Sequence, residues 1–104
     1  MAANPANDKT PNASGERMRL NVIVSGDVQG VSYRAFVRKQ ATGLDITGHA
    51  ENIADGRVEV VAEGYRDDLE LLLVKMRMGP THAVVEDLDV SWAEASGLRG
   101  FHVY

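Results

Sequence analysis

Alternating apolar and polar positions open the patterned part of the chain. From Arg19 onward, apolar side chains recur at every second position, which is the period of a β-strand, and they include Leu20, Val22 and Val24. After a glycine-containing break the period becomes helical. The periodic residues of this second stretch are Tyr33, Phe36, Val37, Ala41 and Leu44. Gly43 is well placed to end that helix, so the pattern predicts a strand followed by a helix.

The rest of the chain predicts a hairpin, a second helix and two further strands. Residues 46–53 and 57–64 are predicted strands, and the Asp55-Gly56 pair between them suits a tight hairpin turn. Asp67 and Asp68 are acids where a helix N-terminus favours negative charge. The apolar face of this helix consists of Leu69, Leu72, Leu73 and Met76. Gly79-Pro80 stops the helix, alternation returns over residues 83–93, and a short strand fits residues 101–104.

The element order is β-α-β-β-α-β with an additional terminal strand. It predicts an α+β fold of the ferredoxin-like split type, with a mostly antiparallel sheet and two helices covering one face. A chain of 104 residues is sized for one such domain. Residues 1–17 carry few bulky apolar side chains and are predicted to be a disordered tail, which leaves residues 18–104 as the domain. Because this scaffold hosts many unrelated activities, the fold alone assigns no function.

Composition excludes several classes of function. The net charge of -4 and the pI of about 5.2 mean that the molecule lacks the positive field that drives nucleic-acid binding. RNA recognition on the open sheet also fits poorly, because the first and third predicted strands have no aromatic residue for base stacking. The chain has no cysteine, which excludes disulfides, thiolate nucleophiles and thiolate zinc sites.

Metal and membrane sites are not expected either. His49, His82 and His102 are far apart in sequence, so a histidine-only metal site would need a tertiary coincidence, and we expect no metal or other cofactor. The N-terminus lacks the basic start and apolar core of a secretory signal. No apolar run approaches the roughly 18 residues of a membrane span. These features predict a cytoplasmic protein without a membrane partner.

The segment GDVQGVSYR, residues 26–34, joins the first predicted strand to the first helix. Free main-chain N–H groups and the helix dipole make such a junction favourable for an anion. Gly26 and Gly30 lack a Cβ atom, so the backbone between them can approach a ligand closely. Arg34 could hold two phosphate oxygens. An ordinary tight turn explains the same residues, and the segment is not a Walker motif, because no Lys-Ser or Lys-Thr follows.

The same segment resembles the signature of the acylphosphatase family, in which a Val-Gln-Gly-Val run precedes an aromatic residue and an arginine. The stretch from Gly48 to Asn52, with Asp55-Gly56-Arg57-Val58-Glu59 after it, is similar to the second marker of that family. Glu63-Gly64, Gly79-Pro80 and residues 101–104 also match in place. The resemblance extends from about Arg19 to Tyr104. It favours membership of this family over the interpretation of residues 26–34 as an ordinary tight turn.

The resemblance implies a metal-independent hydrolase whose substrate is a small-molecule acyl phosphate. Arg34 would bind the phosphate and Asn52 would orient the attacking water. The main-chain amides of the segment would cradle the phosphate, a role that falls on Gly26, Asp27, Val28, Gln29, Gly30, Val31 and Ser32. Such a sparse site suffices because carboxylate is a good leaving group, so positioning and charge stabilisation do most of the work. Small size and the lack of a surplus apolar face favour a monomer.

Each assignment has a simpler alternative. Arg34 could be a solvated or salt-bridged surface residue, and Asn52 could hydrogen-bond its own backbone at the turn. Gln29 could support the loop internally or face solvent. The aromatic residues are most simply core; they include Tyr33, Phe36, Trp92 and Phe101. As a second class of function, the segment could serve a non-catalytic module that binds phosphate or an acyl phosphate.

The chain also departs from the family pattern. Tyr33 stands where phenylalanine is more usual, and its hydroxyl needs a partner if the side chain is buried. His49 stands where tryptophan is common and Glu51 where a basic residue is common, while Asp27 adds a negative charge to the segment. Because strand side chains alternate faces, His49 and Glu51 should point away from the face that carries Asn52. We expect these departures to affect stability or long-range attraction more than chemistry, and they leave room for slower turnover.

Overall fold

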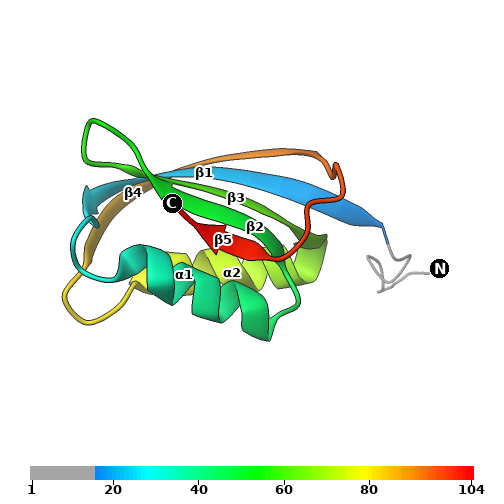
Figure 1. Ribbon diagram of the computed structural model, residues 1–104, viewed down its shortest axis with the longest axis horizontal. Helices are drawn as coiled ribbons and strands as arrows, with labels where there is room; N and C mark the ends of the chain where they lie inside the picture. The colour runs from blue at the N-terminus through cyan, green and yellow to red at the C-terminus, as the bar shows by residue number, and fades with distance from the viewer. Residues whose placement is uncertain (1–15) are drawn as a thin grey trace.

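Two helices cover one face of a five-stranded sheet in the computed structural model, which describes residues 16–104 (Figure 1). The elements in chain order are β1 (Arg17–Asp27), α1 (Tyr33–Gly43), β2 (Thr47–Asn52), β3 (Val58–Tyr65), α2 (Arg66–Met78), β4 (Val84–Glu94) and β5 (Phe101–Val103). This order confirms the predicted β-α-β-β-α-β arrangement with a terminal strand. No helix in the described part of the chain is long and apolar enough to cross a membrane.

The predicted boundaries differ from the observed ones by a few residues. Strand β1 begins at Arg17 and continues through Gly26 and Asp27, which pair with Val85 and Val84 of β4. A register shift between Ser25 and Gly26 marks a bulge in this pairing, and the predicted loop is therefore shortened to residues 28–32. The predicted disordered tail falls largely on residues 1–15, which lie outside the described residues.

The strand order in the sheet is β4-β1-β3-β2-β5. Strands β1 and β3 occupy central positions, and every pairing among the first four strands is antiparallel. Strand β5 is the exception, because it pairs parallel to β2, with Gly48 opposite Phe101 and Ala50 opposite Val103. The end of β5 therefore lies beside the middle of β2, which brings the last residues of the chain close to the proposed site.

The core lies between the sheet and the two helices. Leu20, Val22 and Val24 of β1 face the helices and are fully buried. The helices contribute Tyr33, Val37 and Ala41 from α1 and Leu69, Leu72 and Met76 from α2. Each buried Val or Leu side chain contributes about 1.5–3 kcal/mol relative to exposure. This packing fixes the start of α1 against the sheet, and residue 34 follows directly after the buried Tyr33.

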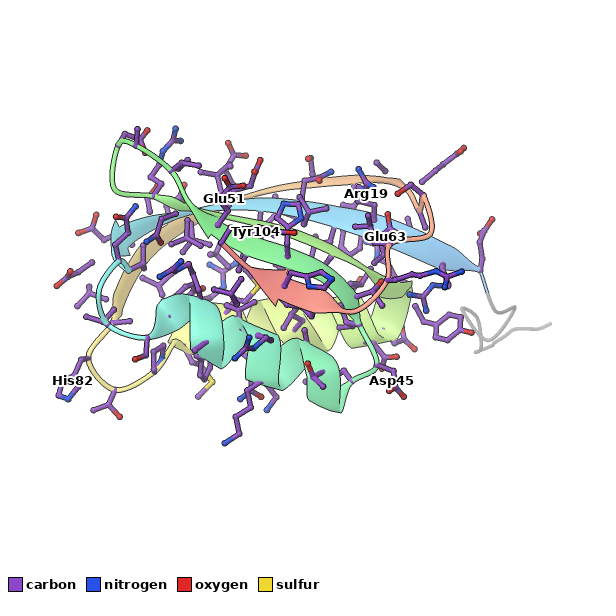
Figure 2. The ribbon with its side chains drawn as sticks, in the orientation of Figure 1. Arg19, Asp45, Glu51, Glu63, His82 and Tyr104 are labelled. Carbon is purple, nitrogen blue, oxygen red and sulfur yellow. The ribbon has the colours of Figure 1, made fainter. Side chains whose placement is uncertain are left out.

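A buried carboxylate holds the β4–β5 loop against the outer face of the sheet, which is the face opposite the helices. Glu63 is fully buried, and its two oxygens accept hydrogen bonds from the main-chain N–H groups of Ser96, Gly97 and Leu98 at 2.8–2.9 Å. The Arg19 guanidinium lies 2.8 Å from the same carboxylate, and Figure 2 labels both side chains near this loop. Burial alone would raise the pKa of Glu63, but these hydrogen bonds lower it to about 2.

Candidate active site

The loop between β1 and α1, the β2–β3 hairpin and the end of β5 all lie at one end of the molecule (Figure 1). The loop is fastened to the hairpin by Gln29. Its Nε2 atom donates hydrogen bonds to the carbonyl oxygens of Ile53 and Arg57, both at 2.9 Å. Neither alternative weighed from the sequence describes this residue, since Gln29 neither bonds within its own loop nor points only to solvent. It links two segments that are distant in sequence.

The loop backbone has the conformation of an anion-binding turn. Gly30 has φ 73° and Ser32 has φ 64°, so two left-handed residues flank Val31. Left-handed residues in tight turns build the concave main-chain nests that bind anions. Within residues 16–104, no turn, loop or cap hydrogen bond is donated by a main-chain N–H of residues 29–32. The Ser32 side chain makes no capping bond to α1, so the loop and the start of the helix present free donors.

A hollow of about 350 Å³ lies over this loop. Its lining consists of Val28, Gly30, Ser32, Tyr33, Arg34, Ala35 and Val103. Val28 is buried in the core beneath and Val31 packs partly against it, so both side chains anchor the loop. A Cβ atom built on Gly30 would meet no atom within 4 Å, so the space beside this glycine is open. The hollow falls in the size range of small-molecule sites.

Arg34 is half-buried and is oriented by the neighbouring sheet edge. Its Nη1 atom donates a hydrogen bond to the main-chain oxygen of Tyr104. Tyr104 in turn donates its main-chain N–H to the carbonyl oxygen of Ala50 in β2, at 2.9 Å. The guanidinium is thus tied, through one residue, to the strand that carries Asn52. The guanidinium also has four N–H donors besides the one bonded to Tyr104 available for an anion in the hollow.

Asn52 is the last residue of β2, and its side-chain oxygen is buried without a hydrogen-bond partner in the described part of the chain. This finding excludes the turn alternative, in which the side chain would bond its own backbone. Asn52 lies two residues beyond Ala50, which is about 7 Å further along the same strand face. An unpartnered buried amide oxygen is costly unless a water or a ligand satisfies it, so this oxygen is a free acceptor at the end of β2.

Two other ionisable side chains, Asp27 and Tyr33, lie near the hollow and bear on the charge of the site. Asp27 is exposed, so its charge is screened by solvent over a distance of about 10 Å at moderate salt. The Tyr33 hydroxyl donates a hydrogen bond of 2.9 Å to the carbonyl oxygen of Met76, which satisfies the predicted need for a partner. Burial raises the pKa of Tyr33 above its ordinary value, and the hydroxyl stays neutral at physiological pH. Among the residues that line the hollow, Arg34 is the one with a positively charged side chain.

The predicted site residues fall into three groups. In the loop group, Val28, Gly30, Ser32 and Arg34 line the hollow, Val31 packs partly against the core, and Gln29 braces the loop from the hairpin side. Gly26 and Asp27 belong to β1, where they pair with β4, so the main-chain segment that can cradle an anion is shorter than the predicted one. Asn52 does not line the hollow itself but lies at the neighbouring strand end. The sequence reasoning missed Tyr104 and Val103, although residues 101–104 were noted as matching.

A possible metal-ligand group lies elsewhere. Among the described residues, His49, Glu51 and Glu59 offer ligand atoms that lie within 4.8 Å of one another. These side chains belong to the outer face of the sheet. Gly48 and Ala50, which alternate with His49 and Glu51 along β2, are buried and face the helices. None of the three lines the hollow over the loop. The fold and the hollow together define an α+β protein in which a glycine-containing loop and one arginine line the hollow and an asparagine ends the neighbouring strand.

Comparison with known proteins agrees with this description. A model of the acylphosphatase family matches residues 20–103. An acylphosphatase of Thermus thermophilus is 56% identical over 86 residues, which cover 83% of this chain and 98% of the relative. One of Deinococcus radiodurans is 53% identical over 87 residues, which cover 84% of this chain and all of the relative. The crystal structure of acylphosphatase from Bacillus subtilis matches with a TM-score of 0.82 at 32% identity, over 84% of this chain and 98% of that chain.

The chain therefore belongs to the acylphosphatase family. The activity that follows from this membership is hydrolysis of the carboxyl–phosphate bond of an acyl phosphate, a small-molecule substrate, as the resemblance implied. The structural match at 32% identity also agrees with the predicted ferredoxin-like α+β fold. The roles of individual residues in the reaction are a separate question.

Proposed function

We propose that Arg34 and the main-chain amides of residues 28–32 bind the phosphate group of an acyl phosphate, and that Asn52 orients the water that attacks it. The observation that carries this proposal is the hollow itself, in which Arg34 and the left-handed loop residues Gly30 and Ser32 share one lining. A hydrogen bond to a charged group contributes about 1.5–3 kcal/mol net. Two or three such bonds reach the roughly 4 kcal/mol of millimolar binding, although the molecule as a whole is acidic.

The reaction needs little from the protein beyond positioning. The water oxygen bound at Asn52 attacks phosphorus, the bond between phosphorus and the carboxyl oxygen breaks, and the carboxylate leaves with the bonding electron pair. One proton of the water goes to the phosphate product or to solvent, because Asn52 cannot act as a base at neutral pH. The guanidinium of Arg34 and the free N–H groups of the loop stabilise charge on the phosphoryl oxygens in the transition state. No residue in this scheme requires a metal ion.

Substitution of Arg34 tests the assignment. Two lost charged hydrogen bonds correspond to about 3–6 kcal/mol, so Arg34→Ala should lower kcat/KM for an aryl acyl phosphate by at least about a hundredfold. The assay is run with a chelator present, and inorganic phosphate should inhibit the wild-type protein competitively. Arg38→Ala removes an exposed guanidinium one turn further along α1 and serves as the matched control. Undiminished turnover in Arg34→Ala would overturn the proposal.

The alternative function is a non-catalytic module that binds phosphate or an acyl phosphate through the same loop. The acidic departures Asp27 and Glu51 motivate it, because both add negative charge. It predicts thermal stabilisation by inorganic phosphate without product formation, so several turnovers per protein molecule would exclude it.

Location, assembly and partners belong to the same proposal. A cytoplasmic monomer without a nucleic-acid partner fits a chain of net charge -4 whose helices are amphipathic and cover a single core. Size-exclusion chromatography with light scattering tests the monomer, and a single mass near 11.3 kDa is the expected result.

A further inference from the structure

A cluster of metal-ligating side chains lies on the outer face of the sheet, on the side away from the helices. His49 and Glu51 stand two residues apart in β2, and Glu59 of β3 is directly opposite Glu51 in the strand register. One ligand atom from each of the three residues lies within 4.8 Å of the other two. Figure 2 shows Glu51 projecting from the sheet away from the two helices. The cluster therefore brings an imidazole and two carboxylates together on adjacent strands.

The two carboxylates face each other across the hairpin, and neither of them takes part in an ion pair among the described residues. Within residues 16–104, the ion pairs are Arg19–Glu63, Arg57–Asp55 and Arg66–Glu70, so neither Glu51 nor Glu59 takes part in one. The strand register places a third acidic residue, Asp89 of β4, in the same row across the sheet. Ile23 of β1 lies between them, opposite Glu59 on one side and opposite Asp89 on the other. Like charges directly opposite each other across strands are destabilising. A bound cation would remove this repulsion.

We propose that His49, Glu51 and Glu59 form a binding site for a divalent transition-metal ion of the zinc class. One imidazole nitrogen and two carboxylate oxygens are ligands that Zn²⁺ accepts, with water completing the coordination. An imidazole ligand disfavours Mg²⁺ and Ca²⁺, which prefer oxygen ligands throughout. Zinc bonds of about 2.0–2.2 Å place tetrahedral ligands about 3.3 Å apart, so small side-chain rotations close the cluster around the ion.

The surroundings favour a preformed site. All three ligands are half-buried and come from paired strands of a hairpin, so their Cα positions are fixed by the sheet. The His49 ring meets the ring of Tyr104 nearly edge-on, with centroids 5.7 Å apart, which restricts the orientation of the imidazole. His102 lies next to His49 in the β2–β5 pairing, but its Nε2 atom lies 2.9 Å from the Arg99 carbonyl oxygen and it is not part of the cluster.

This site is separate from the proposed phosphate site. The hollow over the loop is lined by residues of the β1–α1 junction and by Val103. None of these residues belongs to the metal cluster. A metal ion here would stabilise the hairpin rather than take part in hydrolysis. The inference therefore stands independently of the proposed function, and its test does not use activity.

Binding of Zn²⁺ to the chelator-treated full chain tests the site. Titration calorimetry should give one zinc ion per chain, and a hundredfold excess over Kd should raise Tm by about 10–20 °C. His49→Gln and Glu51→Gln should each weaken binding at least about tenfold, because each removes one of three ligands. His102→Gln is the matched control and should bind zinc like the wild type. The sequence has only one further histidine, His82, and it belongs to no metal-ligand group among the described residues.

Three results would overturn the proposal. One is the absence of both binding heat and a Tm shift at millimolar Zn²⁺. Another is equal zinc affinity in the wild type and in His49→Gln, which would place the ion elsewhere. The last is Mg²⁺ binding as tight as Zn²⁺ binding. That result would show that cations in general are attracted to an acidic face and that the three residues do not form a selective site. Circular dichroism of each variant before titration verifies that the fold is kept, and Glu51→Gln tests the same site if His49→Gln fails to fold.

Discussion

Gln29 donates a side-chain hydrogen bond to the carbonyl oxygen of Ile53, the residue that follows Asn52 in the chain. Through this bond and its counterpart to Arg57, the phosphate loop is fastened to the strand end that carries the proposed water-orienting residue. The Gln29 side chain therefore links the two parts of the proposed site directly. A change at Gln29 should affect substrate binding and the attack of water together.

Gln29→Leu keeps the approximate size of the side chain but removes both hydrogen bonds. Because each neutral bond contributes about 1 kcal/mol, kcat/KM for an acyl phosphate should fall by about tenfold to thirtyfold, with both kcat and KM affected. Steady-state kinetics measures the effect. Gln40→Leu makes the same change on α1, away from the loop, and should leave the kinetics unchanged. Wild-type kinetics in Gln29→Leu would show that the loop does not need the hairpin.

Asn52→Ala removes the unpartnered amide oxygen at the end of β2. If Asn52 orients water only in the transition state, kcat should fall by at least about tenfold while KM stays close to the wild-type value. Asn21→Ala, on the outer face of β1, is the matched control. A variant that kept kcat and lost only affinity for substrate would contradict the water-orienting role and would indicate a role in binding.

The buried Glu63 should make stability dependent on pH in the acid range. Its pKa in the folded chain is about 2, below the ordinary value of 4.5. Between these two pH values the unfolded chain binds more protons, so the free energy of unfolding should decrease as pH falls from about 4.5 towards 2. Above pH 4.5 the contribution is fully present. Urea unfolding of the wild type at a series of pH values measures this dependence.

Glu63→Gln provides the comparison. The substitution leaves the Arg19 charge and the N–H groups of the β4–β5 loop without their carboxylate, and it should cost about 3 kcal/mol of stability at pH 7. The difference between variant and wild type should shrink as pH approaches 2. Glu70→Gln disrupts an exposed pair with Arg66 and should change stability by less than about 1 kcal/mol. A difference that stays constant with pH would contradict the lowered pKa of Glu63.

Glu51→Gln should stabilise the metal-free protein. Glu51 faces Glu59 directly across the hairpin, and relief of that repulsion is expected to contribute about 0.2–1 kcal/mol. For a domain of this size the gain corresponds to a rise of about 1–8 °C in Tm, measured with a chelator present. Glu86→Gln removes an exposed charge from β4 and should leave Tm nearly unchanged. A lower Tm in Glu51→Gln would mean that Glu51 makes a favourable interaction instead.

The periodic elements were predictable because their signals are local. The helical spacing of Tyr33, Val37 and Ala41 corresponds to the buried face of α1, and the Asp55-Gly56 turn was predicted where the chain reverses between β2 and β3. The end of β1 was not predictable. Gly26 and Asp27 have a turn-like composition, yet a bulge after Ser25 lets both pair with β4. Local pattern does not encode pairing with a strand almost 60 positions further along the chain.

The same distinction explains what was missed at the site. The resemblance of a short motif to the acylphosphatase signature was enough to predict that Arg34 and the glycine-containing loop belong to one site. The contacts that position them depend on strand register: Gln29 reaches the hairpin, and Tyr104 reaches Arg34 only because β5 pairs with β2. Register also brings Glu59 opposite Glu51, eight positions away in sequence, which no periodicity predicts.

The one-sided packing of the helices also bears on how this molecule can diverge. Away from Glu63 and the loop that it holds, substitutions on the side of the sheet opposite the helices neither enlarge a void in the interior nor displace the arginine and the glycine-containing loop. Charge, and any affinity that comes with it, can accumulate there while turnover remains under separate selection. This small domain thus has one surface on which new properties can arise and another that is constrained by chemistry.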